Sequence, residues 1–163
     1  MIVPAALALL IAADTVPGAY QAEINRALFE HCPRLIEGTL SLSDPAQLEG
    51  IGYVPGTVRN GNRFYQRVVG DQFVELHYGT NPHGRVCWVS YGGPEVQSLF
   101  DGATAAAREQ GYEGEPAAQL GGPSRMIALR RRDGGSLTFN QMIVITDSRE
   151  VVGFAFVSTP ERE

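Results

Sequence analysis

The sequence contains no lysine, and all 13 of its basic residues are arginine. The absence of a lysine amine excludes Schiff-base chemistry, a P-loop phosphate site and a Ser-Lys dyad. The sequence also lacks the GxSxG, HExxH and GxGxxG motifs and a calcium-binding EF-hand loop. No motif therefore points to a reaction, and we predict no cofactor.

The chain also has few positive charges. Its 13 arginines face 18 acidic residues, which gives a formal net charge of -5. A general affinity for nucleic acid requires an excess of cationic side chains that displace counterions from the phosphates. We therefore predict that nucleic acid is not a partner.

Long apolar runs are missing as well. Residues 1–13 are apolar and uncharged, but a transmembrane helix needs about 20 such residues. The run matches the hydrophobic region of a secretory signal peptide, with cleavage after Ala13 or Ala19. We predict that residues 1–19 are a signal peptide, that no stable membrane anchor remains after cleavage, and that the mature protein is periplasmic or secreted. A buried N-terminal helix is the alternative.

Cysteine occurs only twice, as Cys32 and Cys87. In an exported chain this pair predicts a disulfide, whereas in a reducing cytosol it would be two buried thiols. By the chain-entropy relation, closing a loop of about 55 residues stabilises the fold by about 4 kcal/mol. A zinc site built from His77, His83 and Cys87 would leave Cys32 alone, so we predict no metal site.

The sequence does contain enough apolar residues to form one hydrophobic core. Of its 163 residues, 44% are hydrophobic and 19% charged, and we predict a single domain over residues 20–163. Apolar residues recur at helical spacing over 20–32 and 95–110, and we expect Pro33 to end the first of these helices. Ser43-Asp44-Pro45 predicts the start of a short helix.

Six further segments alternate like strands and are rich in β-branched and aromatic residues: 63–69, 72–78, 85–91, 125–131, 137–146 and 151–158. Residues 52–62 and 113–123 are rich in glycine and proline, and we expect them to be irregular. Strands that follow one another directly form antiparallel pairs. The predicted fold is therefore α+β, with an antiparallel sheet of about six strands in two three-stranded runs, packed by an N-terminal helix and a central helix.

Polar side chains on the first two strands form the densest candidate site. A three-residue loop over 70–72 would place Arg67 opposite Glu75 and align the apolar residues on the other face. The same register would place Tyr65 opposite His77. A carboxylate beside a histidine can orient a general base, but the sequence shows no nucleophile or oxyanion donor near them. We interpret the four residues as a binding face.

Arg130, Arg131 and Arg132 form the only basic run, just before a hairpin signal at Asp133-Gly134. Consecutive guanidinium groups can contact an anionic partner. They can also keep a turn soluble and protect a strand edge. Both interpretations stay open at this point.

Three segments carry a resemblance to known proteins: ALFEHC at 27–32, GIGYVPG at 50–56 and GRVCWVS at 84–90. Together with the leader, they resemble small exported proteins of GC-rich Gram-negative bacteria. The resemblance implies export and brings no activity or catalytic residue with it. The order of elements is also similar to that of type III secretion chaperones, which are cytosolic and end in a helix, whereas this chain has a leader-like start and a predicted final strand.

Export, one disulfide and the lack of a reactive constellation together favour a non-catalytic binding module for a protein or small-molecule partner. A small exported hydrolase with a site near Glu75 and His77 is the first alternative. The second is an inhibitor of another enzyme that inserts the loop over 130–136. A concave pocket that contains both Glu75 and His77 would favour the hydrolase.

Overall fold

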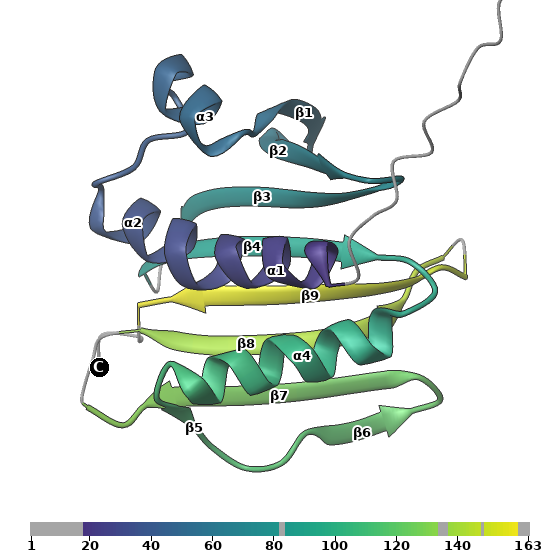
Figure 1. Cartoon of the computed structure of the whole chain (residues 1–163). Helices are drawn as coiled ribbons and strands as arrows, with labels where there is room; N and C mark the ends of the chain where they lie inside the picture. Colours follow the sequence, from purple (N-terminus) through teal and green to yellow (C-terminus); the bar gives the residue numbers. More distant parts are fainter. Residues whose placement is uncertain (1–17, 82–83, 134–136, 148, 160–163) are drawn as a thin grey trace, which may run out of the picture.

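A computed structural model describes residues 18–81, 84–133, 137–147 and 149–159 of the chain. One antiparallel sheet carries helices across one of its faces, and no described helix covers the other (Figure 1). We call this uncovered side the open face. No helix in the described part of the chain has the length and apolar character needed to cross a membrane. The predicted signal peptide falls almost entirely on residues 1–17, which lie outside the described residues.

The helical segments are α1 (Ala19–Arg26), a π-helical turn η1 (Ala27–His31), α2 (Cys32–Glu37), α3 (Pro45–Ile51) and α4 (Val96–Glu109). The predicted short helix is confirmed as α3. Its N-terminus is capped by Asp44, whose side chain accepts hydrogen bonds from the backbone N–H groups of Ala46 and Gln47. The predicted central helix is confirmed as α4.

The prediction that Pro33 ends the first helix is wrong. The helix continues through the wider turn η1 into α2, and Pro33 lies in the first turn of α2. A proline is tolerated where no N–H is needed, and the π-helical turn shifts the hydrogen-bond pattern at that point. As a result, one long helical segment extends from Ala19 to Glu37 along the sheet.

The strands are β1 (Val54–Arg59), β2 (Asn62–Val69), β3 (Gln72–Asn81), β4 (Gly84–Gly92), β5 (Tyr112–Glu113), β6 (Ala118–Gly121), β7 (Ser124–Arg131), β8 (Thr138–Ile145) and β9 (Val151–Ser158). The α+β class and the antiparallel sheet are confirmed. Within the described part of the chain the sheet has nine strands rather than six, in the order β1-β2-β3-β4-β9-β8-β7-β5, with β6 also paired to β7. The six predicted strands correspond to β2–β4 and β7–β9.

The missed strands lie in the two segments expected to be irregular. Asn60 and Gly61 both have positive φ, 51° and 78°, and form a two-residue turn between β1 and β2 that suits an Asn-Gly pair. Pro55 and a register shift in β1 hid this strand from the alternation pattern. β1 carries Arg59 onto the open face, where its guanidinium contacts Glu75.

The core lies between the helices and the covered face of the sheet. Its fully buried side chains include Ile24, Leu28, Phe100, Val74, Leu76, Val89, Phe139 and Val157. The apolar stripes predicted on the two long helical segments supply the helical half of this core. The core therefore accounts for the side chains on the covered face of the sheet, and those on the open face are described with the candidate site.

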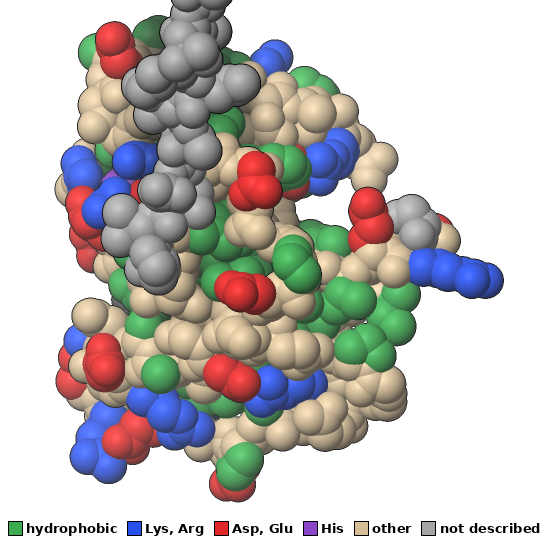
Figure 2. All heavy atoms as spheres, turned by 45° about the vertical axis from the view of Figure 1, so that its right-hand side comes forward, with side chains coloured by type: hydrophobic (Ala, Val, Ile, Leu, Met, Phe, Trp, Pro, Cys, Tyr) green, Lys and Arg blue, Asp and Glu red, His purple; other side chains and the backbone are tan. Residues whose placement is uncertain are grey.

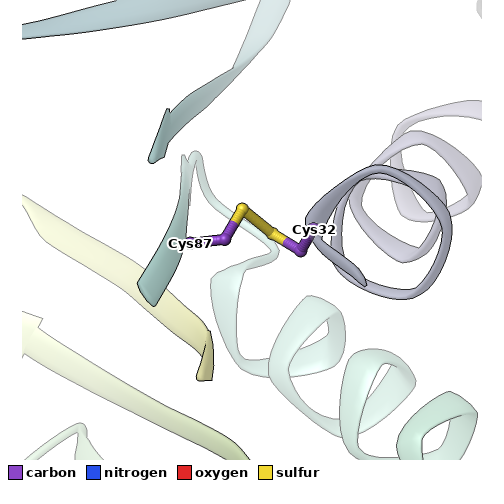
Figure 3. Close-up of a disulfide and its surroundings, with 2 residues drawn as sticks. All are labelled: Cys32 and Cys87. Atoms are coloured by element: carbon purple, nitrogen blue, oxygen red, sulfur yellow. A yellow bond between two sulfur atoms is a disulfide. The ribbon is translucent and has the colours of Figure 1, made fainter. Parts of the chain in front are cut away.

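The predicted disulfide is confirmed: Cys32 at the start of α2 is bonded to Cys87 in β4, with their Cα atoms 5.4 Å apart (Figure 3). Both cysteines are fully buried. The bond joins the N-terminal helical segment to the middle of the sheet. The bond also makes Cys87 unavailable as a ligand of the zinc site considered from the sequence. His83, another ligand of that site, lies outside the described residues.

Candidate functional site

The register of β2 and β3 differs from the predicted one. The loop has two residues, Gly70 and Asp71, so Arg67 pairs with Val74 and Glu75 pairs with Gln66. Gly70 has a φ of 65°, and glycine at the first position of a two-residue hairpin loop is the pattern of a II′ turn. The turn geometry thus outweighed the apolar alignment that favoured a longer loop.

A shift of one residue moves side chains to opposite faces of the sheet. Tyr65 and Arg67 therefore lie on the covered face, and Tyr65 pairs with Leu76. Glu75 and His77 lie on the open face, opposite Ser90 and Trp88 of β4. The four residues expected to form one binding face thus belong to two faces of the sheet by register, although Tyr65 and His77 both line one hollow.

Glu75 is the buried charge of the open face and is 4% exposed. Two nitrogens of Arg59 donate to its carboxylate oxygens, at 2.8 and 3.1 Å. The Gln66 amide and the Ser90 hydroxyl donate to the same carboxylate, at 2.9 and 3.0 Å. With these four donors the carboxylate is well satisfied, and its lone pairs are taken by the protein itself.

His77 is held apart from this carboxylate by other groups. Its ring stacks on Trp88, with centroids 4.9 Å apart, and contacts Phe64 on the other side. Nδ1 lies 2.7 Å from the carbonyl oxygen of Arg63, so Nδ1 carries the proton and donates it to that acceptor. Glu75 does not orient this ring, and the pair is not a catalytic dyad.

A hollow of about 840 Å³ lies at one end of the sheet. The β2–β3 hairpin forms one side, the β8–β9 hairpin the other, and the segment from the end of β4 to the start of α4 forms the floor. Figure 2 looks toward this end and shows the surface hollowed between two projecting parts, with hydrophobic, acidic and basic side chains around it. We call this hollow the end pocket.

Glu75 and Arg59 line the end pocket, whereas His77 lines a separate hollow of about 520 Å³. The concave pocket that would favour a hydrolase thus contains one of the two expected residues. Its walls are largely apolar, with Phe73 on one hairpin and Val152 and Phe154 on the other.

Tyr20 of α1 opens the sheet at this pocket. The pairing of β3 with β4 stops at Glu75 and Ser90. Two residues further on, the hydroxyl of Tyr20 donates to the carbonyl of Phe73 at 3.0 Å and accepts from the N–H of Gly92 at 3.1 Å. Continued pairing would join these two backbone groups directly. The hydroxyl therefore acts as a spacer between two strands, and burial raises the pKa of Tyr20, which keeps the donor protonated.

On the covered face, Arg67 belongs to a buried polar cluster beneath α1. Its Nε lies 3.2 Å from the carboxylate of Glu23, which also accepts from Arg26 at 2.9 Å and from the Tyr53 hydroxyl at 3.3 Å. Burial raises the pKa of Glu23 despite the two guanidinium groups. Glu23 is 4% exposed, whereas the side chains of Arg26 and Arg67 are 44% and 31% exposed, so the carboxylate is buried and its two guanidinium partners reach the surface.

His31 lies beside this cluster, 2% exposed, with its ring edge-on to Tyr53 at 5.9 Å. Neither ring nitrogen has a hydrogen-bond partner in the described part of the chain. Burial lowers the pKa of His31, and the nearby Glu30 only partly opposes this effect. The ring is therefore neutral in the folded protein at neutral pH.

The basic run lies far from the end pocket, at the opposite end of β7. Arg131 donates to Asp133 at 3.1 Å, and Arg132 donates to Glu113 at 2.8 Å. Arg130 is exposed. Two of the three guanidinium groups are thus paired with carboxylates, and the rest of the loop proposed as an inhibitory wedge, residues 134–136, lies outside the described residues.

Sequence reasoning found Glu75 but missed Arg59 and Tyr20. The Asn60-Gly61 hairpin signal could have revealed that Arg59 ends a strand beside β2. Nothing in the sequence indicates that Tyr20 reaches between β3 and β4, because that contact depends on where the helix crosses the sheet.

Comparison with known proteins finds no family model, no curated protein and no solved structure that matches this chain. The function therefore has to be inferred from the geometry of the pocket and its surroundings.

Proposed function

We propose that the protein is an exported, non-catalytic binding domain that holds a small ligand in the end pocket. The observation that carries this proposal is the pocket itself: about 840 Å³ of space between two hairpins, with largely apolar walls. Ligand sites of small molecules have this size and this mainly apolar character, with a few polar groups that fix orientation.

Binding is favoured over catalysis by the state of the polar groups. A general base must be able to take a proton from a nucleophile or substrate. The carboxylate of Glu75 already accepts four hydrogen bonds, and His77 is fixed elsewhere on the open face between two aromatic rings. The pocket is thus better suited to hold a molecule than to transform it.

Export is supported by the buried disulfide. Disulfides persist in oxidising compartments and are rare in reducing ones. The bond between Cys32 and Cys87 joins two elements of the core, and both cysteines are fully buried. A periplasmic or secreted location would supply the conditions that this bond requires.

The proposal is tested with Nile red, an uncharged apolar dye whose fluorescence rises on leaving water. We expect saturable binding to the wild-type protein. We expect binding to weaken at least tenfold in Val152→Trp, which fills the pocket, and to stay unchanged in Val68→Trp, which adds the same bulk at a position 71% exposed on the open face. Absent binding, or equal loss in both variants, would contradict a ligand site here.

A further inference from the structure

A row of rings crosses the open face from β2 to β9. The centroids of Phe64 and His77 lie 5.0 Å apart, and those of His77 and Trp88 lie 4.9 Å apart. The ring of Phe156 follows, edge-on to Trp88 with centroids 6.4 Å apart. Each ring is held by its neighbour in one of the arrangements that aromatic pairs prefer. The row therefore forms a wall whose shape is fixed before a ligand arrives, which lowers the entropic cost of binding.

A second hollow, of about 380 Å³, lies on the open face where this row ends. Trp88 and Phe156 line it, and so does Asn140 of β8, which pairs with Phe156. We call this hollow the face pocket. Its lining shares no residue with that of the end pocket. Its volume falls within the range of small-molecule sites, about 300–1,000 Å³.

Two polar groups of this lining have no hydrogen-bond partner among the described residues: the side-chain amide of Asn140 and the indole N–H of Trp88. The other polar side chains are engaged. The Ser158 hydroxyl lies 2.8 Å from the hydroxyl of a threonine on β8, and the Thr159 hydroxyl accepts from a backbone N–H of β4 at 3.2 Å. Gln141 is fully buried on the covered face and bonds two side chains there. An amide offers donors and an acceptor side by side, so Asn140 suits a ligand that presents both.

The face pocket carries no charge on its own side of the sheet among the described residues. Arg85 is the one charged residue of its lining. It lies two residues before Cys87, on the covered face, where its guanidinium donates to the carbonyl of Ile36 in α2. A charged ligand would lose hydration on entering and would meet no fixed counter-charge. The pocket therefore favours an uncharged ligand.

The apolar part of the lining favours an aromatic ring. Met126 and Met142 are paired across β7 and β8, and Met126 is 42% exposed. A thioether sulfur makes favourable contacts with aromatic rings, and methionine is common at binding surfaces for this reason. A flat ring placed here would contact both sulfurs and the ring of Phe156.

We propose that the face pocket is a second ligand site, and that its ligand is an uncharged nitrogen heterocycle with an N–H donor beside a ring acceptor. The heterocycle lies against Phe156 and the two methionines, and its edge forms two hydrogen bonds with the Asn140 amide. Adenine has such an edge, and an asparagine amide matches it with two hydrogen bonds. A free base and the base of a nucleoside or nucleotide share this chemistry.

The proposal is tested by calorimetry with 9-ethyladenine and 9-ethyl-N6,N6-dimethyladenine, which keeps the ring and loses the amino donor. We expect the first to bind the wild-type protein at least tenfold more tightly. Trp88 is the only tryptophan of the chain, so its fluorescence should change on titration. Adenosine should bind more tightly than adenosine monophosphate, whereas tighter binding of the monophosphate would contradict an uncharged ligand.

A matched pair of variants removes one asparagine amide at different places on the sheet. Asn140→Leu should weaken binding of 9-ethyladenine to the level of the dimethyl compound. Binding of the dimethyl compound should stay as in the wild type, which shows that the variant keeps the pocket. Asn62→Leu is the control, at an exposed position at the start of β2 and outside the lining, and should change neither. Val152→Trp, which fills the end pocket, should also change neither.

The outcomes distinguish this inference from the proposed function. Equal binding of the two heterocycles to the wild type, an unchanged Trp88 signal, or equal loss in Asn62→Leu and Asn140→Leu would overturn the inference. Loss of 9-ethyladenine binding in Val152→Trp would place the heterocycle in the end pocket and would overturn it too. Nile red binding without heterocycle binding would leave the proposed function in place, and the reverse result would overturn that function alone.

Discussion

Two buried polar residues, Glu75 and His31, differ in whether their polar atoms have hydrogen-bond partners. The carboxylate of Glu75 accepts four hydrogen bonds. His31, equally buried, makes none among the described residues. A satisfied buried charge costs little as long as its partners remain, whereas an unpaired ring tolerates burial only while it is neutral. Each situation leads to a measurable effect.

The depressed pKa of His31 predicts that the protein loses stability in mild acid. Below the ordinary value of 6.5, the unfolded chain binds a proton at this position more readily than the folded one does, so a falling pH favours unfolding. Glu23, whose pKa is raised, contributes with the opposite sign above its ordinary value. Comparing the pH dependence of the free energy of unfolding in the wild type and in His31→Phe isolates the contribution of the histidine.

We therefore expect the free energy of unfolding, measured in urea between pH 7.5 and 5.5, to fall more steeply in the wild type than in His31→Phe. An NMR titration of the His31 ring should give a midpoint below 6.5. Identical pH slopes in both proteins, or a midpoint above 6.5, would contradict this prediction.

Arg59→Ala should destabilise the protein by about 1–2 kcal/mol at neutral pH, because it leaves the buried Glu75 without its charged partner. The cost is smaller than for a fully buried pair, since the Arg59 side chain is 52% exposed and water can replace part of it. Arg63→Ala, an exposed arginine of the same hairpin, is the control and should cost less than about 0.5 kcal/mol. Equal effects in the two variants would argue against a structural role for this ion pair.

At the scale of helices and strands, the sequence predicts what depends on local periodicity. The apolar stripes around Ile24 and Phe100, the six alternating strands and the pairing of the two cysteines all follow from residues close to one another or from residue type. The register of β2 and β3 does not, because a two-residue turn at Gly70-Asp71 and a three-residue turn differ in local geometry and not in composition. The end pocket cannot be predicted from the sequence either, because it forms only where Tyr20 and two hairpins far apart in the sequence come together.

Removing the disulfide tests how strongly the helical segment is held to the sheet. We expect a Cys32→Ala/Cys87→Ala variant to lose about 4 kcal/mol of unfolding free energy, as the chain-entropy relation gives for a closed loop of 55 residues. Urea titrations of the wild type with and without a reducing agent should show a shift of the same sign. An unchanged midpoint on reduction would contradict the prediction.

Tyr20→Phe tests the spacer between β3 and β4. Loss of the hydroxyl removes partners from the carbonyl of Phe73 and the N–H of Gly92, and we expect a loss of about 1–2 kcal/mol. Hydrogen exchange of the Gly92 amide should become faster. Tyr78→Phe, on the same sheet and outside the pocket lining, is the control, and equal changes in both variants would rule out the special role of Tyr20.

At the scale of the whole molecule, the structure bears on where the predicted leader is removed. The first hydrogen bond of α1 joins the N–H of Ala22 to the carbonyl of Gly18, and Tyr20 is anchored in the sheet. Cleavage after Ala19 would remove Gly18 and the first residue of α1, whereas cleavage after Ala13 leaves the helix whole. We expect N-terminal sequencing of the exported protein to begin at Asp14; a start at Met1 would contradict export, and a start at Tyr20 would contradict this choice of site.

The sheet order has a consequence for how the chain reaches its final state. β9 lies between β4 and β8, so the halves made by β1–β4 and by β5–β8 share no strand pairing until residues 151–158 arrive. Pairings between residues this far apart in the sequence slow folding. The central pairing of the sheet can therefore form only after the last described strand has been synthesised.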